Sequence, residues 1–165
     1  MDLPVLDKDL IIDQFQQLLA ENEPVECPLR HVFLKGVYIR QIFMPAKTIN
    51  SKGEEVETVI VSKIHATQHP FIISEGSVAI YNKADDFLGV VSAPYLDMTE
   101  PGTRRILHIL EDCRWMTIHM LPYITGEENN WSERRKRTLL ERIENDIIMK
   151  REINLIGKDG AECHL

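Results

Sequence analysis

Residues 56–81, VETVIVSKIHATQHPFIISEGSVAIY, decide the fold. Short runs of Val, Ile, Phe and Tyr alternate in this stretch with polar residues and with a Ser-Glu-Gly corner at 74–76. Runs of β-branched and aromatic residues as short as these are typical of strands, and glycine marks the turns between them. The stretch therefore predicts three successive short strands, at 56–64, 71–73 and 78–81.

The same pattern continues on both sides of this stretch. Turn residues recur every eight to twelve positions, which is typical of a sandwich or barrel and not of a parallel α/β sheet. Further strands are predicted at residues 32–44, 88–91, 93–98, 105–110 and 114–121.

The two ends of the chain show a helical period instead. Apolar residues recur at three- and four-residue spacing over residues 7–21, where Asp7 can cap the helix, and again over 133–152. The chain is therefore divided into an N-terminal helix and connector (1–30), a barrel (31–122), and a C-terminal helix and tail (123–165). The apolar stripe of each helix must be buried, against its own barrel or against a partner chain.

Several landmarks between residues 31 and 122 occur in a familiar order. They are Gly36-Val37-Tyr38-Ile39-Arg40, Lys63-Ile64-His65-Ala66-Thr67-Gln68-His69-Pro70, Glu75-Gly76, Pro101-Gly102-Thr103-Arg104-Arg105 and Trp115-Met116-Thr117-Ile118-His119. In this order they resemble the cupin superfamily, and more closely the small single-domain cupins encoded by tailed phages. The resemblance implies a mainly β fold, a cupin-type β-barrel (jelly roll) with an N-terminal helix and a longer C-terminal helix.

The metal-binding positions of that family are only partly kept. The usual first motif, His-x-His followed by Glu, is matched here by Lys63, His65 and His69. In the second motif Arg105 occupies the place of the usual His. Lys and Arg stay protonated and are poor ligands, whereas a second imidazole can coordinate a metal ion.

A three-histidine site can still be assembled on one face. His65 and His69 are four residues apart, so an extended strand directs both to the same side. Trp115, Thr117 and His119 share one face of the last predicted strand in the same way. If both faces are interior, three imidazoles can hold Zn, Mn, Fe or Ni. A metal-free ligand site and hydrogen-bonded core histidines are the alternatives, and His31 and His108 are weaker candidates for the same cavity.

Basic residues beside these histidines extend the predicted pocket. Arg104 and Arg105 follow a Pro-Gly turn and can form a planar fork for a carboxylate or phosphate. The alternative is that they are exposed and pair with Glu100 or Asp112. The expected pocket residues, besides the histidines, are Lys63, Arg105, His108, Trp115 and Thr117.

Composition excludes several classes of function. The net charge of −7 argues against general nucleic-acid binding, and the basic run 134–137 fits a solvated helix face. Neither a membrane-length apolar stretch nor a secretion signal is present. Three cysteines without a CxxC pair indicate thiols in a reducing compartment, so the cytoplasm is expected. Phosphate loops, nucleophile elbows and dinucleotide fingerprints are missing as well.

Two functional hypotheses follow. The first is a non-catalytic binding or assembly protein that forms a homo-oligomer or larger assembly through its terminal helices. The phage resemblance would place it in the host cytoplasm or in a virion. The second is a metal-dependent cupin enzyme, dioxygenase- or isomerase-like, that acts on a small molecule through His65, His69 and His119. The sequence does not decide whether the protein is an enzyme, because fold does not imply function.

Overall fold

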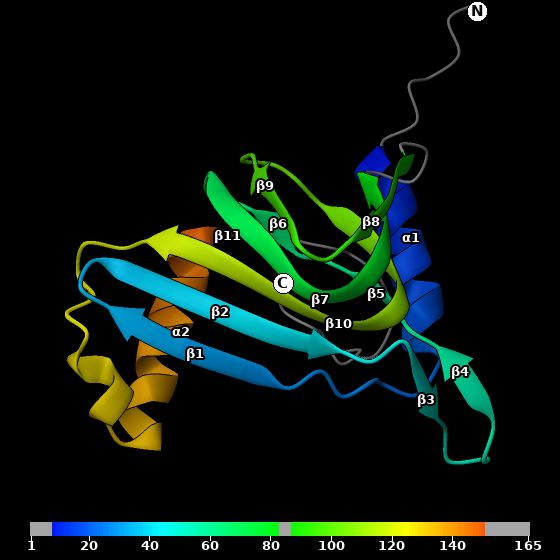
Figure 1. Cartoon of the computed structure of the whole chain (residues 1–165), viewed down its shortest axis with the longest axis horizontal. Coiled ribbons are helices and arrows are strands. Elements are labelled where there is room, and N and C mark those ends of the chain that lie inside the picture. Colours follow the sequence, from blue (N-terminus) through cyan, green and yellow to red (C-terminus); the bar gives the residue numbers. More distant parts are fainter. Residues whose placement is uncertain (1–7, 83–86, 151–165) are drawn as a thin grey trace, which may run out of the picture.

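Two long, bent strands organise the molecule, β7 (His69–Asn82) and β10 (Arg105–Met120) (Figure 1). The structure is a computed structural model that describes residues 8–82 and 87–150. The two strands pair antiparallel along most of their length, with register shifts between Ile109 and Trp115. One half of β7 pairs with β9 (Tyr95–Thr99) and the other with β8 (Phe87–Ser92). The bend therefore curls a single sheet into a barrel.

Gly76 makes the bend in β7 possible. Its φ is +85°, a conformation that side chains disfavour, and a Cβ there would lie 2.2 Å from the Asp112 carbonyl oxygen. β7 and β10 can approach this closely at the bend only because the residue has no side chain. The Ser-Glu-Gly corner predicted from sequence is thus a bend inside one continuous strand, not a turn between two.

The remaining strands complete the barrel and its edges. The main sheet has the order β1-β2-β10-β7-β8, with β5 added to β10 and β9 added to β7. Two small two-stranded sheets, β3 with β4 and β6 with β11, lie beside it. Their bounds are β1 (Leu29–Leu34), β2 (Val37–Met44), β3 (Lys47–Ile49), β4 (Glu55–Glu57), β5 (Val59–Val61), β6 (Ile64–His65) and β11 (Ile148–Met149).

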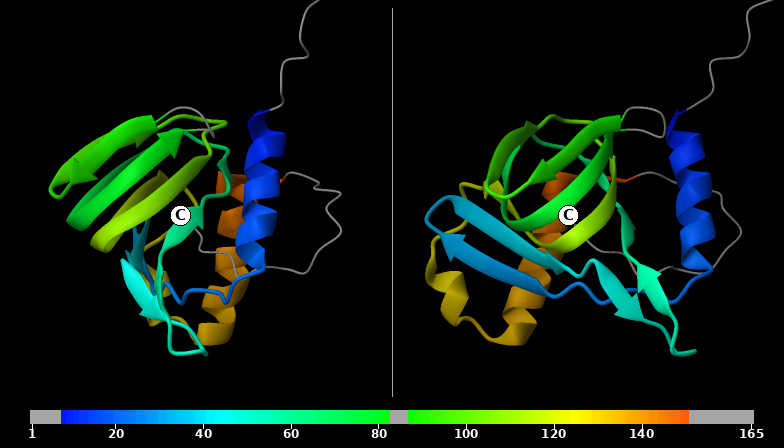
Figure 2. Two further views of the ribbon diagram at one scale, coloured as in Figure 1. Left: turned by 90° about the vertical axis from the view of Figure 1, so that its right-hand side faces the viewer. Right: turned by 45° about the vertical axis from the view of Figure 1, so that its right-hand side comes forward.

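The helices lie where the sequence predicts them. Figure 2 shows α1 (Lys8–Ala20) standing beside the curled sheet. A short 3-10 helix, η1 (Glu127–Asn130), precedes α2 (Glu133–Ile147). The predicted mainly β barrel with a helix at each end is therefore confirmed. Asp7, the predicted cap of the first helix, lies outside the described residues. No helix in the described ranges has the length and apolar character needed to cross a membrane.

The second helix ends earlier than predicted. The spacing predicts a helix to residue 152, but α2 ends at Ile147 and Ile148 is extended, with φ −117° and ψ 131°. Ile148 pairs with His65 of β6 and is buried there. Pairing with β6 therefore buries this apolar residue after the helix has ended.

Two hydrophobic clusters hold the fold together. One fills the barrel and is centred on a stack of Phe71 and Trp115, whose rings are 4.4 Å apart and nearly parallel. The other lies between α2 and the concave side of the sheet. The apolar stripe of α2 is covered by its own barrel through Leu139, Leu140, Ile143 and Ile147.

Candidate functional site

Alternation along two neighbouring strands directs polar side chains into the barrel. On β2 every second residue is buried, which places Tyr38 and Arg40 inside. On β10 the same rule places Thr117 and His119 inside. In the strand register Thr117 lies opposite Arg40, and His119 lies opposite Tyr38. A polar layer therefore forms at one end of the barrel interior, beyond the Phe71–Trp115 stack.

The three predicted histidines come together in this layer. The ring centroids of His65 and His69 are 4.8 Å apart, and those of His69 and His119 are 4.3 Å apart. All three residues are only 2% exposed. We name the assembly the interior polar cluster, which consists of Arg40, His65, His69, Thr99, Arg105, Thr117 and His119.

Each imidazole has one buried ring nitrogen without a partner in the part of the chain that the structure describes. The Nδ1 atom of His69 donates to the Thr67 carbonyl oxygen at 2.9 Å, so in the neutral ring Nε2 carries a lone pair. The Nε2 atom of His119 is 3.0 Å from the Thr117 hydroxyl. Among the described residues, His65 Nδ1, His69 Nε2 and His119 Nδ1 have no hydrogen-bond partner and are buried. Buried polar atoms of this kind are rare and call for an explanation.

The histidines are neutral at physiological pH. Burial lowers the pKa of His65 to about 3 and that of His119 to about 2. The pKa of His69 is also lowered, mainly by burial, with Arg105 and Arg40 adding to the effect. Removing an imidazolium from water is costly, and the two guanidinium charges repel it further. The net charge of the cluster therefore comes from its arginines.

Arg40 and Arg105 are two buried guanidinium groups, each 5% exposed. The Nε atom of Arg40 donates to the Tyr38 hydroxyl at 3.0 Å, and Nη1 of Arg105 donates to Thr99 Oγ1 at 2.8 Å. Arg105 also lies over the Phe71 ring, 4.7 Å from its centroid. In the described part of the chain, neither forms an ion pair with a carboxylate, and Arg40 Nη1 and Arg105 Nε lack partners.

Both arginines carry positive charge at neutral pH. Burial lowers the pKa of Arg105 to about 10, which still leaves its guanidinium protonated at pH 7. The negative charge of Asp97 opposes this lowering, although Asp97 forms no ion pair with Arg105. A buried charge without a paired counter-ion is costly. The cluster thus has a net positive charge that the described side chains do not neutralise by ion pairing.

Arg104, the neighbour of Arg105, has a carboxylate partner. Its side chain is also buried, but Nη1 donates to Asp13 Oδ1 at 2.5 Å and Nη2 donates to Gln16 Oε1 at 2.7 Å. Both partners are on α1. The alternative of exposed arginines paired with Glu100 or Asp112 was wrong, because both side chains are buried, Arg104 against α1 and Arg105 inside the barrel.

The other predicted pocket residues divide into two groups. Trp115 and Thr117 face the barrel interior. Lys63 instead forms an ion pair with Glu144 of α2, and His108 lies 3.1 Å from Glu57 on a partly exposed surface. These two are therefore not members of the interior polar cluster, because each has a carboxylate on another element.

Sequence reasoning did not select Arg40, Tyr38 or Thr99. The available signal was the alternation in β2, where Arg40 falls between the inward-facing Tyr38 and Ile42. His31 reaches the cluster only indirectly. Its Nδ1 atom lies 2.7 Å from the Tyr38 hydroxyl, which accepts a hydrogen bond from Arg40 Nε.

The cluster does not fit a divalent metal ion as it stands. The rings of His65 and His69 meet edge to face at 61°, and those of His69 and His119 are tilted by 43°. No group of three His, Cys, Asp or Glu side chains within residues 8–82 and 87–150 is placed to hold a metal ion. The positive charges of Arg40 and Arg105 also repel a metal cation, whereas they attract an anion.

Comparison with known proteins gives structural neighbours from the cupins. No family model matches the chain, and no curated protein matches its sequence. A cupin-2 domain protein from Shewanella frigidimarina is 15% identical, with a TM-score of 0.41, over 67% of this chain and 91% of that one. An RmlC-like cupin from Methanocaldococcus jannaschii is 11% identical, with a TM-score of 0.40, over 64% and 87%. Ectoine synthase from P. lautus is 16% identical, with a TM-score of 0.42, over 66% and 75%.

Proposed function

We propose that this chain is a non-catalytic binding protein whose interior polar cluster holds a small anion. The observation that carries the proposal is the pair of buried guanidinium groups of Arg40 and Arg105. Neither has a carboxylate partner in the described ranges, and each keeps an unpaired N–H group. Guanidinium groups with open donors are the preferred protein partners of carboxylate and phosphate.

The contrast with Arg104 supports a ligand. Arg104 also has an Nε atom without a partner among the described residues, but Asp13 neutralises its charge and Gln16 bonds a second nitrogen. Arg105, one residue later and equally buried, donates to the Thr99 hydroxyl and lies over the Phe71 ring. An anion bound beside Arg105 would supply the missing counter-charge and offset the desolvation of the guanidinium.

The histidines narrow the chemical class of the ligand. Because His69 Nε2 is a lone-pair acceptor, it favours a ligand that carries a hydroxyl donor next to its carboxylate. A small hydroxycarboxylate meets both demands. Imidazoles with pKa values of about 2 to 3 stay neutral near pH 7, so they are poorly suited to general acid catalysis there. This favours binding over proton-transfer chemistry.

A metal-dependent cupin enzyme is the second candidate. The observation in its favour is that three unpaired imidazole nitrogens belong to one buried cluster. The two guanidinium charges count against it, as do the ring orientations. Protein purified without an affinity tag or added metal should contain about one transition metal per chain if this candidate is right, and His65→Ala should lose it.

An assembly role is a separate part of the proposal. A virion-associated or phage-encoded function rests on the resemblance of residues 31–122 to phage cupins. It stays a prediction of that resemblance, and recovery of the protein from purified virions would test it.

Thermal unfolding with added anions tests the binding function. Lactate, acetate and phosphate are titrated at constant ionic strength into the wild type, Arg105→Gln and Arg114→Gln. Arg114 is the matched control because it is exposed and already paired with Glu75. We expect lactate to raise the Tm of the wild type and of Arg114→Gln. At a hundredfold excess over Kd, a ligand stabilises by about 2.7 kcal/mol.

The variant at the cluster decides the outcome. Arg105→Gln should unfold cooperatively but lose the shift with lactate. Equal shifts in all three proteins, or no shift in the wild type with any of the three anions, would overturn the proposal. Metal in the wild type that is lost in His65→Ala would favour the second candidate instead.

A further inference from the structure

The carboxylate of Asp97 acts on Arg105 without pairing with it. Tyr95, Asp97 and Thr99 alternate along β9, so their side chains share one side of this strand. Thr99 is buried and accepts a hydrogen bond from Arg105, and Tyr95 packs against the hydrophobic cluster that fills the barrel. Asp97 therefore lies on the inward side of β9, between these two residues.

The strand register brings Asp97 beside the ring over which Arg105 lies. Asp97 lies opposite Phe71 in the pairing of β9 with β7. The Arg105 guanidinium is 4.7 Å from the centroid of the Phe71 ring, and the Tyr95 ring centroid is 5.9 Å from it. Burial lowers the pKa of Arg105, and the negative charge of Asp97 opposes this effect. The two charges therefore interact across this group of aromatic rings.

Hydrogen bonds on β9 hold the Asp97 carboxylate in place. The Tyr95 hydroxyl donates to Asp97 Oδ2 at 2.9 Å, and the Met98 N–H group donates to Oδ1 at 2.7 Å. Both carboxylate oxygens are thus bonded to groups of their own strand, whereas Arg105 donates to the Thr99 hydroxyl. Asp97 is therefore a fixed negative charge near the positive charge of Arg105.

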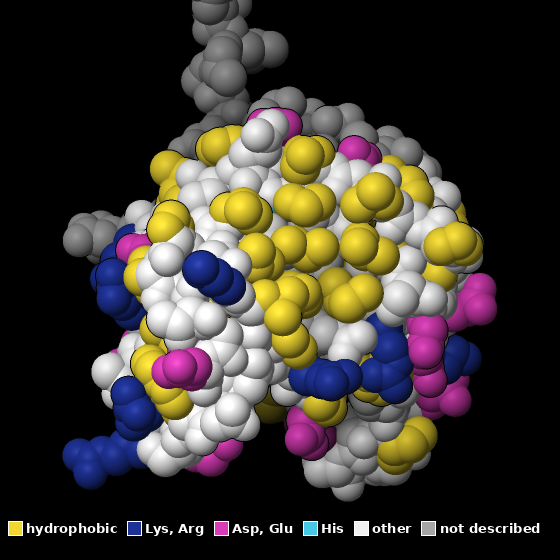
Figure 3. All heavy atoms as spheres, turned by 60° about the vertical axis from the view of Figure 1, so that its left-hand side comes forward, with side chains coloured by type: hydrophobic (Ala, Val, Ile, Leu, Met, Phe, Trp, Pro, Cys, Tyr) yellow, Lys and Arg dark blue, Asp and Glu magenta, His cyan; other side chains and the backbone are white. Residues whose placement is uncertain are grey.

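No basic side chain in the described ranges pairs with Asp97 to cancel its charge. Its neighbours on β9, Leu96 and Met98, point to the other side of the strand and are exposed hydrophobic residues. Figure 3 shows hydrophobic side chains of this kind gathered over much of one face of the molecule. The charge of Asp97 therefore acts on an anion that binds beside Arg105.

We propose that Asp97 is a specificity-determining residue that restricts the interior polar cluster to ligands with a single negative charge. This inference rests on the proposed function, because it concerns the anion that the cluster holds. Repulsion between two charges is proportional to each of them. Asp97 therefore repels a dianion beside Arg105 twice as strongly as it repels a monoanion.

The balance of charge around the cluster supports a monoanion. The histidines are neutral, so the charged groups are the guanidiniums of Arg40 and Arg105 and the carboxylate of Asp97. Together they carry one net positive charge, which a monoanion neutralises. A dianion would leave one negative charge uncompensated in a buried place, and such a charge is costly.

Isothermal titration calorimetry with lactate and tartronate at pH 7 tests this inference. Tartronate has a second carboxylate where lactate has a methyl group, so the two probes are similar in size and differ in charge. Asp97→Asn removes the charge and keeps the shape of the side chain. We expect the wild type to bind lactate more tightly than tartronate. In Asp97→Asn the affinity should rise about threefold for lactate and about tenfold for tartronate, because the repulsion doubles with the charge of the ligand.

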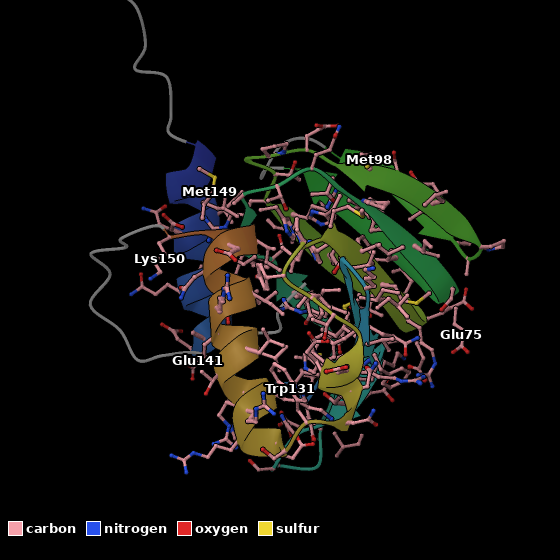
Figure 4. The ribbon with its side chains drawn as sticks, turned by 90° about the vertical axis from the view of Figure 1, so that its left-hand side faces the viewer. Glu75, Met98, Trp131, Glu141, Met149 and Lys150 are labelled. Carbon is pink, nitrogen blue, oxygen red and sulfur yellow. The ribbon has the colours of Figure 1, made fainter. Side chains whose placement is uncertain are left out.

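Glu75→Gln is the matched control, because it removes one exposed carboxylate from the same sheet. Glu75 pairs with Arg114 and, in Figure 4, lies well apart from Met98, the neighbour of Asp97. This variant should keep the wild-type ratio of the two affinities. High salt should reduce the difference between Asp97→Asn and the wild type, because Asp97 is exposed and its charge is screened.

The outcomes separate this inference from the proposed function. A wild type that prefers tartronate, or an unchanged ratio of affinities in Asp97→Asn, would overturn the inference and leave anion binding intact. Binding of neither probe by the wild type or by Asp97→Asn would overturn both. Asp97→Ser also lacks the charge and should give the same ratio as Asp97→Asn. Asp97 is exposed, so both variants should unfold cooperatively in thermal unfolding without ligand.

Discussion

The two halves of the barrel interior differ in polarity: one is packed with apolar side chains, and the other holds arginines and histidines. In one half, Phe71 and Trp115 stack among aliphatic side chains, and the Thr58 hydroxyl is the buried polar atom beside them that lacks a partner among the described residues. In the other half, five buried nitrogen atoms of arginines and histidines lack a partner among the described residues. Packing of apolar side chains explains the first half. The second half keeps buried polar atoms that the described residues do not satisfy, and the proposal of a bound anion rests on these atoms.

Arg104 and Arg105 show the same contrast on a smaller scale. They are adjacent in sequence and equally buried, but only Arg104 has a carboxylate partner. The pair with Asp13 fastens α1 to the barrel and is a structural interaction. The comparison predicts that substitutions in the two settings will affect stability and binding in opposite ways.

The largest effect is expected in the apolar half. Trp115→Ala should lower the free energy of unfolding by about 3–5 kcal/mol, because it removes a buried ring and leaves a cavity. Urea denaturation measures this loss. Trp131→Ala is the control, because Trp131 is partly exposed and lies against Arg135, and its loss should be much smaller.

The next largest effect is a difference in stability between substitutions that affect Arg104 and Arg105. Asp13→Ala leaves Arg104 charged and buried, and should cost about 3–5 kcal/mol in urea denaturation. Arg105→Met should cost much less, or stabilise the ligand-free protein, because it removes a buried charge that has no carboxylate partner in the described chain. A loss for Arg105→Met as large as that for Asp13→Ala would contradict the distinction.

The histidines make the polar half sensitive to acid. Their pKa values lie well below the unfolded value of about 6.5, so between about pH 6.5 and 3 the unfolded chain binds more protons. Stability should therefore be complete above about pH 6.5 and fall as pH is lowered. Each histidine contributes a slope of up to about 1.4 kcal/mol per pH unit.

A matched pair of variants isolates this acid sensitivity. His119→Phe keeps a ring between Tyr38 and His69 and should reduce the slope of unfolding free energy against pH. His108→Gln changes a histidine outside the cluster and should keep the wild-type slope. Identical slopes for His119→Phe and the wild type would contradict the claim that the buried histidines cause the loss of stability in acid.

The smallest effect is expected at the surface. Arg114→Ala breaks an exposed ion pair with Glu75 and should change stability by less than about 1 kcal/mol. Thermal unfolding at low and high salt measures this change. A larger loss would mean that this ion pair contributes to the fold itself.

Much of the fold could be predicted because its determinants are local. Alternation predicted most of the strands, and three- and four-residue spacing predicted both helices. The end of α2 could not be predicted in this way, because Ile148 continues the apolar stripe and leaves the helix only to pair with β6. The bend at Gly76 likewise depends on Asp112, a distant residue.

The site could be predicted only in part, because many of its contacts join residues that are far apart in sequence. The three histidines were identified by spacing and do come together, although His65 ends β6 and His69 begins β7. Their surroundings depend on contacts between elements that are far apart in sequence. Lys63 pairs with Glu144 of α2 instead of facing the interior. Asp13, the partner of Arg104, lies 91 residues away in sequence. No local pattern contains this information.

Crystallography with bromide as the only halide tests the central claim most directly, because bromide is a small anion with a strong anomalous signal. We predict an anomalous peak within about 3.5 Å of the guanidinium nitrogens of Arg40 and Arg105, and its loss in Arg105→Gln. Ordered water alone between these side chains, with no anomalous peak, or a metal ion held by the three imidazoles, would contradict an anion-binding interior.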